Sequence, residues 1–271
     1  MSHAFDTDFF SLPRPRIFGH RGAAGELPEN TMVSFERAAR DGAMYLELDV
    51  HMSRDEQIIV SHDGGLARVC GLDALIREMS WAEIQAADAG YMLTFDGGST
   101  FPFRGRSIKI PRLIEVLGAF RELNYIVEIK QTEPSLVPHL LAVVDAVGLR
   151  RRVLIASEFD APIGEVRKLA PQIPTNFSYG DVAEFLQAMA GYRPGYEPPG
   201  AALQVPAEYQ GWKLVTPQSV EFAHRAGVEI HVWTVNDESE MYQLLDGGVD
   251  GLISDFPARA LAVARLSRPL K

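Results

Sequence analysis

The stretch Met44-Tyr45-Leu46-Glu47-Leu48-Asp49-Val50 ends in an alternation of apolar and acidic residues. On a β-strand every second side chain lies on the same face, so Glu47 and Asp49 share one face and the apolar residues at even positions share the other. Two acids on one face of an otherwise apolar strand are hard to explain by packing alone. The stretch therefore predicts a strand with one face in the core and the other at a polar site.

Similar apolar runs recur along the chain, separated by amphipathic stretches with helical spacing. The strand candidates are Arg16–His20, Met44–Val50, Gln57–His62, Tyr125–Lys130, Val153–Ser157, Pro174–Ser178, Ala201–Val205, Glu229–Val235 and Asp250–Ser254. This alternation of strands and helices is typical of α/β proteins.

The number of candidates favours a TIM (β/α)₈ barrel. Only six residues, 51–56, precede the third candidate, and a parallel crossover normally takes a dozen or more. We therefore expect residues 57–62 to run antiparallel to the preceding strand, which leaves eight strands for a barrel. A doubly wound open sheet is the alternative. The expected unit is a single domain over residues 1–271, with a small insertion subdomain at about 63–110 whose length suggests a lid or substrate-binding role.

Composition restricts the class of protein. The chain has 271 residues, a formal net charge of −10 and one cysteine, Cys70. The acidic balance disfavours broad nucleic-acid binding, and one cysteine excludes an internal disulfide. We find no secretory signal and no stretch long and apolar enough to span a bilayer. These features predict a cytoplasmic protein with no nucleic-acid partner and no stable membrane insertion.

Acids and cations stand together at the predicted strand ends. Glu128, near the end of the strand at 125–130, adds a third carboxylate to Glu47 and Asp49. Such hard oxygen ligands suit Mg²⁺ or Ca²⁺, and the alternative is ordinary ion pairing with Arg21 and Lys130. Cations beside a metal site are expected where an anion also binds, and Arg21 offers a bidentate fork that suits a phosphate.

Two histidines, His20 and His62, each end an apolar strand beside a charged neighbour. Imidazole titrates near neutrality, so one ring can accept a proton while the other donates one. Trp233, near a late strand end, either walls a substrate pocket or packs in the core. The chain has no Walker loop, dinucleotide fingerprint, HExxH or paired CxxC. A metal, cations and a proton-transfer pair together indicate phosphoester chemistry.

The order of these residues resembles that of the glycerophosphodiester phosphodiesterase family. The matching segments are His20-Arg21-Gly22, Pro28-Glu29-Asn30-Thr31, Glu47-x-Asp49, His62-Asp63, Glu128-x-Lys130, Val232-Trp233-Thr234-Val235-Asn236, Gly248-Val249-Asp250-Gly251 and Asp255-x-Pro257. They extend over about residues 16–257. The chain departs from the family pattern at Glu56, where a turn glycine is usual, and at Ser157-Glu158-Phe159, which replaces a simpler Ser-Phe pair.

This resemblance implies a TIM barrel with an insertion that hydrolyses glycerophosphodiesters in a metal-dependent reaction. Substrates such as glycerophosphocholine and glycerophosphoethanolamine would yield sn-glycerol 3-phosphate and an alcohol. By resemblance, the metal ligands are Glu47, Asp49 and Glu128, the acid/base pair is His20 and His62, and the phosphate contacts are Arg21 and Lys130. We expect Trp233 to contact the substrate as well, and Mg²⁺ or Ca²⁺ to be the divalent cation.

Several alternatives stay open from the sequence. The preferred alcohol, the resident metal and the oligomeric state, monomer or homodimer, are not determined. Lysophospholipase D activity would need an apolar groove for an acyl chain, for which the candidates are Tyr91, Phe95, Phe101 and Phe103. A catalytically silent phosphodiester-binding barrel is a further alternative, and the presence of all seven polar site residues argues against it.

Overall fold

A ring of parallel strands forms the centre of the molecule in the computed structural model, which describes residues 5, 7–191 and 195–267. Its strands are β1 (Arg16–His20), β2 (Tyr45–Met52), β4 (Asn124–Ile129), β5 (Val153–Ala156), β6 (Ala202–Val205), β9 (Glu229–Val232) and β10 (Gly251–Ser254). Their order is β5-β4-β2-β1-β10-β9-β6. This order brings the first half of the chain beside its last strand.

The segment at Thr175 and Asn176 closes the gap between β5 and β6. Thr175 forms a parallel bridge to Ile155 of β5, and Asn176 forms one to Ala202 of β6. The predicted strand Pro174–Ser178 is therefore wrong as a regular strand, because only these two isolated bridges form. The TIM-barrel architecture is nevertheless confirmed, and the open-sheet alternative is wrong because the two edges of the sheet meet through this segment.

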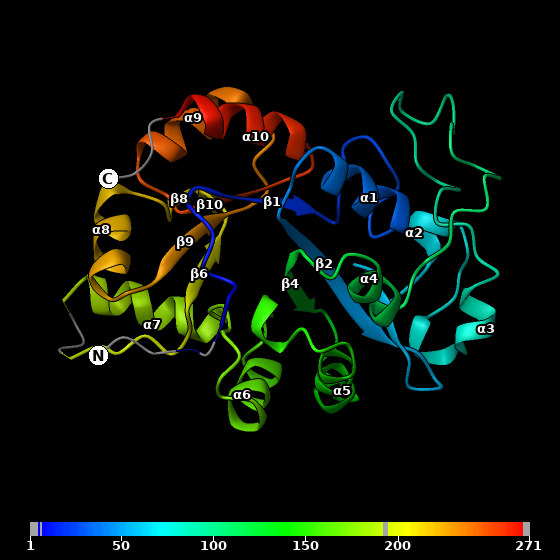
Figure 1. Ribbon diagram of the computed structural model, residues 1–271, viewed down its shortest axis with the longest axis horizontal. Helices are drawn as coiled ribbons and strands as arrows, with labels where there is room; N and C mark the ends of the chain where they lie inside the picture. The colour runs from blue at the N-terminus through cyan, green and yellow to red at the C-terminus, as the bar shows by residue number, and fades with distance from the viewer. Residues whose placement is uncertain (1–4, 6, 192–194, 268–271) are drawn as a thin grey trace.

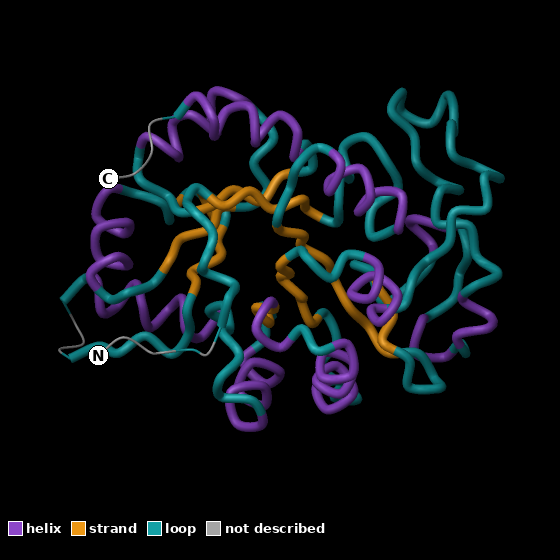
Figure 2. The backbone as a smooth tube through the Cα atoms, in the orientation of Figure 1, coloured by secondary structure: helices purple, strands orange, loops and turns teal. Residues whose placement is uncertain are grey.

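Helices surround the strands (Figure 1 and Figure 2). They are α1 (Met32–Arg40), α4 (Leu113–Ala119), α5 (Val137–Val147), α6 (Asp160–Leu169), α7 (Tyr179–Met189), α8 (Pro217–Arg225), α9 (Glu238–Asp246) and α10 (Pro257–Leu266). Leu46, Leu48 and Val50 of β2 belong to the buried cluster that includes helix residues such as Phe35 and Leu117. The apolar face of β2 thus packs toward the helices, as the alternation of residues 46–50 predicts.

A second apolar layer fills the interior of the barrel. It contains Phe18, Tyr45, Ile126 and Ile253, together with Phe9 from the N-terminal segment. The hydroxyl of Tyr45 donates a hydrogen bond to the carbonyl of Phe9 at 2.6 Å. Tyr45 shares its strand face with the two acids of β2, so those acids lie beyond this layer, toward the carboxyl ends of the strands.

Two short strand pairs accompany the ring. β3 (Ile58–Val60) pairs antiparallel with β2, with Val50 opposite Val60, which confirms the predicted direction of this extra strand. β7 (Glu208–Tyr209) and β8 (Trp212–Lys213) form a hairpin after β6 that the sequence did not predict.

The segment between β3 and α4 has a small core of its own. It contains α2 (Ala67–Cys70), a 3₁₀ turn at Ile76–Glu78 and α3 (Trp81–Ile84), and it stands at one side of the barrel (Figure 1). Its buried residues are Leu66, Cys70, Ile76, Ile84, Ala87, Ala89 and Ile110, which cluster with Ile59 of β3.

The aromatic residues of that segment contact one another and its arginines. The guanidinium of Arg104 lies 4.1 Å from the ring centre of Tyr91 and 3.7 Å from that of Phe101. Phe95 and Phe103 meet edge to face. None of these four candidates for an acyl-chain groove lines the cleft that contains Glu47 and Glu128. Among the described residues, no helix combines the length and apolarity needed to cross a bilayer.

Candidate active site

A sharp turn after β1 places Arg21 over the open end of the barrel. Arg21 has φ +50° and Gly22 has φ +90°, both in the left-handed region. A Cβ atom on Gly22 would lie 2.4 Å from Ser34 Oγ, so this position requires glycine. The turn directs the backbone N–H of Arg21 to Glu47 Oε2, to which it donates at 3.0 Å.

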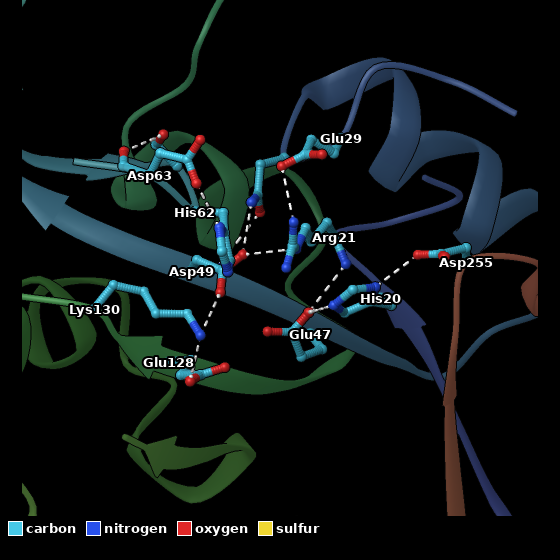
Figure 3. A network of polar contacts seen from close by, with 12 residues as sticks. His20, Arg21, Glu29, Glu47, Asp49, His62, Asp63, Glu128, Lys130 and Asp255 are labelled. Atoms are coloured by element: carbon cyan, nitrogen blue, oxygen red, sulfur yellow. Dashed lines mark hydrogen bonds and ion pairs between the residues drawn. The ribbon is translucent and has the colours of Figure 1, made fainter. Parts of the chain in front are cut away.

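Three carboxylates from adjacent strands converge beside this turn (Figure 3). Glu47 and Asp49 come from β2 and Glu128 from β4, and Asp49 and Glu128 are register partners. One oxygen of each lies within 4.8 Å of the other two. Glu47 is 3% and Asp49 1% exposed, so two of the three acids are almost completely removed from water.

Two cations accompany the carboxylates, as the ion-pairing alternative expects. Arg21 Nε lies 3.1 Å from Asp49 Oδ2. Lys130 Nζ lies 2.6 Å from Glu128 Oε1 and 3.6 Å from Asp49 Oδ1. The side-chain amide of Asn30 also donates to Asp49 Oδ2, at 2.9 Å. Asp49 thus has two cations and one amide donor as partners.

Burial and repulsion between neighbouring carboxylates disfavour the ionised forms of Glu47 and Glu128, even beside two cations. Burial raises the pKa of the Glu47 carboxyl to about 8, and the charge of Asp49 adds to the shift. Burial acts in the same direction on Asp49, but Arg21 and then Lys130 outweigh it and lower the pKa of Asp49. Burial also raises the pKa of Glu128. A further positive charge among these oxygens would favour the ionised form of all three acids.

The donor set fits a divalent cation. Among the described residues, Glu47 Oε1 and Asp49 Oδ1 are buried side-chain oxygens that accept no hydrogen bond. Orphaned carboxylate oxygens are costly in a protein interior, and they are the hard ligands that Mg²⁺ and Ca²⁺ take. Ion pairing with Arg21 and Lys130 therefore accounts for part of the cluster but leaves these two oxygens without a hydrogen bond.

His20 is held in a fixed orientation by a carboxylate from a distant part of the chain. Its Nδ1 lies 2.6 Å from Asp255 Oδ1, and its Nε2 lies 3.9 Å from Glu47 Oε2. Asp255 in turn accepts a hydrogen bond from the amide of Asn236 at 2.7 Å. Burial opposes protonation of His20, but the hydrogen bond to Asp255 and the charge of Glu47 outweigh it and raise the pKa of the imidazole.

His62 has the same kind of partner. Its Nδ1 lies 2.7 Å from Asp63 Oδ1, and its backbone carbonyl accepts a hydrogen bond from His51 Nε2 at 3.0 Å. With Nδ1 of both His20 and His62 engaged by carboxylates, Nε2 is the nitrogen that each ring retains for a substrate. Both rings line the same cleft. The structure thus brings the two histidines together with the three acids and with Arg21 and Lys130.

Several side chains without a predicted role support these groups. Arg21 Nη1 donates to Glu29 Oε1 at 3.0 Å. Arg68, from α2, donates to Glu29 at 2.6 and 2.8 Å and to Asp63 Oδ2 at 2.6 Å. Glu29, Asp63 and Asp255 all fall in segments that match the family pattern, whereas Arg68 lies outside them.

The cleft that contains these groups has a volume of about 320 Å³. Trp233 lines it with 37% of its surface exposed, so the structure places this residue on the cleft wall rather than in the core. Another part of the wall comes from one face of α7 and from the β7–β8 hairpin, which contribute Tyr179, Val182, Ala183, Leu186 and Tyr209. The sequence pattern gave no indication of this second wall.

Comparison with known proteins identifies the family of this chain. The sequence model of the glycerophosphoryl diester phosphodiesterase family matches residues 20–259. A glycerophosphodiester phosphodiesterase of Bacillus subtilis is 29% identical over 278 residues, covering 95% of this chain and 89% of the relative.

Solved structures agree in fold. A glycerophosphodiester phosphodiesterase from Agrobacterium tumefaciens superposes with a TM-score of 0.73 at 25% identity, covering 92% of this chain and 98% of that one. An Oleispira antarctica phosphodiesterase, solved in complex with the product sn-glycerol-3-phosphate, gives a TM-score of 0.71 at 24% identity over 92% of this chain and 96% of that one.

Proposed function

The chain belongs to the glycerophosphoryl diester phosphodiesterase family of phosphoric diester hydrolases, and from this premise we propose how its own residues perform the reaction. The observation that carries the proposal is that two carboxylates, two cations and two carboxylate-held histidines line one cleft, with the buried Asp49 within 4.8 Å of both carboxylates. The substrates proposed are glycerophosphodiesters such as glycerophosphocholine and glycerophosphoethanolamine. The products are sn-glycerol 3-phosphate, which a neighbour of this fold binds, and the free alcohol.

Metal and phosphate are assigned to separate groups. Glu47, Asp49 and Glu128 would hold Mg²⁺ or Ca²⁺, which when bound polarises phosphoryl oxygens and lowers the pKa of an attacking hydroxyl. Arg21 and Lys130 supply fixed positive charge beside the acids. This charge offsets part of the negative charge of the substrate's phosphate group. Trp233 packs against the bound diester from the cleft wall.

His20 and His62 transfer the protons. Asp255 keeps the Nδ1 proton of His20 in place, and Asp63 does the same for His62, so each Nε2 is directed to the cleft. One Nε2 accepts the proton of the attacking hydroxyl, and the other donates a proton to the departing alkoxide. The attacking hydroxyl is either water, which gives sn-glycerol 3-phosphate directly, or the 2-hydroxyl of the glycerol, which gives a transient cyclic phosphate that water then opens to the same product.

The remaining proposals concern the chain as a whole. We propose that residues 1–271 act as one domain, of which residues 1–4, 6, 192–194 and 268–271 lie outside the described part. The proposed compartment is the cytoplasm and the proposed assembly is a monomer or homodimer that binds a small-molecule substrate. The net charge of −10 supports the absence of a nucleic-acid partner.

The direct test is hydrolysis of four glycerophosphodiesters, whose alcohols are choline, ethanolamine, glycerol and inositol. Phosphorus NMR should show sn-glycerol 3-phosphate as the phosphorus-containing product. Chelation should abolish turnover, and Mg²⁺ or Ca²⁺ should restore it. Full turnover of metal-free protein, verified by elemental analysis, would contradict the metal requirement. Cleavage of other phosphodiesters with none of these four would contradict the substrate class.

A further inference from the structure

Glu158 lies on the wall of the cleft and has no part in the proposed steps. It follows β5, at the point where the chain departs from the family's simpler Ser-Phe pair. The phenol of Tyr179 donates a hydrogen bond to Glu158 Oε2 at 3.2 Å. Among the residues that the structure describes, no Lys, Arg or His lies within ion-pair distance of this carboxylate. Within the described part of the chain, Glu158 therefore presents to the cleft a carboxylate that forms no ion pair.

Aromatic side chains line the same cleft. Tyr179, Tyr209 and Trp233 line the cleft and are 55%, 49% and 37% exposed. The face of an aromatic ring attracts cations, and rings grouped around a carboxylate are suited to quaternary ammonium ligands. The accessible rings and Glu158 therefore favour a positively charged organic group.

Helix α7 adds aliphatic groups to this wall. Tyr179, Val182, Ala183 and Leu186 are spaced at i, i+3, i+4 and i+7, so they share one face of α7, and that face lines the cleft. Phe185 on another face is fully buried in the core. An aliphatic surface beside one carboxylate is complementary to an N-methylated ammonium group, because such a group has apolar methyl groups on its surface and carries a positive charge.

Other alcohols match this wall less well. A neutral polyol would leave the aliphatic face of α7 without apolar contact and Glu158 without a counter-charge. A plain alkyl chain would cover the Glu158 carboxylate with groups that cannot pair with it, which is unfavourable for an ionised acid. We propose that Glu158 and the exposed aromatic rings of the same cleft select diesters whose alcohol is a cationic, N-methylated amino alcohol. This inference rests on the proposed function, since it assigns the alcohol end of the same substrate.

The test compares three diesters of glycerol 3-phosphate with different alcohols. They are the choline ester, its neutral carbon isostere the 3,3-dimethylbutyl ester, and the glycerol ester. We expect wild-type kcat/KM to be roughly tenfold higher for the choline ester than for the other two, mainly through KM. Glu158→Gln should reduce that ratio toward one. The matched control, Glu221→Gln on exposed α8, should leave the ratio unchanged.

Each contrary result has a defined meaning. Equal rates for the choline ester and its neutral isostere would overturn recognition by charge and favour an apolar subsite for alkyl chains. An equal loss on all three esters in Glu158→Gln would also overturn the inference and indicate support of the metal site. If wild type hydrolyses none of the esters, the proposed function fails, and NMR titration with tetramethylammonium then decides the inference alone. Binding by wild type that Glu158→Gln weakens supports it, and absence of binding overturns it.

Discussion

Arg68 Nη2 lies 2.6 Å from Glu29 Oε1, and this contact joins the segment after β3 to the loop between β1 and α1. The same guanidinium donates to Asp63 Oδ2 at 2.6 Å. Because Glu29 also accepts from Arg21, and Asp63 holds His62, one side chain supports a phosphate-binding residue and a proton-transfer residue at once. The insertion thus contributes to the site through Arg68.

Arg68→Ala should therefore lower activity with little effect on the fold. We expect kcat/KM to fall roughly 10- to 100-fold, as is usual when a group that orients a site residue is lost. Arg68→Lys should recover only part, because lysine cannot engage both carboxylates in the same geometry. The control is Arg77→Ala in the same segment, whose side chain is 60% exposed. An Arg68→Ala enzyme with normal kinetics, or one that is unfolded by circular dichroism, would contradict the positioning role.

The local part of this site could be predicted from the sequence. The alternation in residues 44–50 correctly places Glu47 and Asp49 on one face, because a strand has a two-residue period that tertiary contacts do not change. The parallel order of strands then brings Glu128 beside Asp49, since the carboxyl ends of neighbouring strands meet. The short link before residue 57 likewise sets the antiparallel direction of β3.

The long-range part could not be predicted from one sequence. The pairs His20–Asp255 and Arg68–Glu29 are separated by 235 and 39 residues, and no local periodicity relates their members. The wall formed by α7 could not be predicted for another reason. Its apolar residues have the same helical spacing as a core-facing stripe, and only the packing of Phe185 shows which face is buried.

Metal binding should stabilise the protein through its acidic cluster. At a free Mg²⁺ or Ca²⁺ concentration of 100 times Kd, the gain is about 2.7 kcal/mol, which raises Tm by roughly 5–10 °C for a chain of this size. Glu47→Gln and Glu128→Gln should lose most of this rise while remaining folded. Differential scanning calorimetry with and without chelator measures it, with Glu36→Gln, an exposed helix residue, as the control. An undiminished rise in both variants would place the cation elsewhere.

At the opposite end of the barrel, Glu229 should make stability sensitive to acid. Arg16 donates to both of its oxygens at 2.8 Å, and these bonds, aided by His231, outweigh burial and lower the pKa of Glu229 to about 2 from an ordinary 4.5. A lowered folded-state pKa gives stability that is complete above pH 4.5 and is lost as pH falls toward 2. The shift corresponds to about 3 kcal/mol.

Glu229→Gln removes the ionisable group, so the variant should be less stable than wild type at pH 7. The difference between the two proteins should shrink between pH 4.5 and pH 2, as Glu229 of wild type becomes protonated. Urea unfolding at a series of pH values measures this difference, and Glu221→Gln on exposed α8 serves as the control. A difference that stays constant over that range would show that the Arg16–Glu229 pair is not linked to the acid loss.

The two histidines should separate by their response to the leaving group. General acid catalysis contributes roughly 10²–10⁴-fold, but only where the departing oxygen needs a proton. A choline alkoxide needs one, whereas nitrophenolate leaves readily without it. Of His20→Ala and His62→Ala, the variant that lacks the acid should fail on glycerophosphocholine yet keep much of the wild-type rate on a nitrophenyl glycerophosphate. The variant that lacks the base should be impaired on both.

The two rings have similar hydrogen-bonded surroundings, so the effects of removing them can be compared directly. Each has its Nδ1 held by a carboxylate, Asp255 for His20 and Asp63 for His62, and each carboxylate keeps a second partner, Asn236 or Arg68, when the ring is removed. His20 lies nearer the acidic cluster, with Nε2 3.9 Å from Glu47, so metal affinity is measured for both variants before their rates are compared. Variants that bind metal normally and lose the same factor on both substrates would show that the histidines position the phosphate instead of dividing proton transfer.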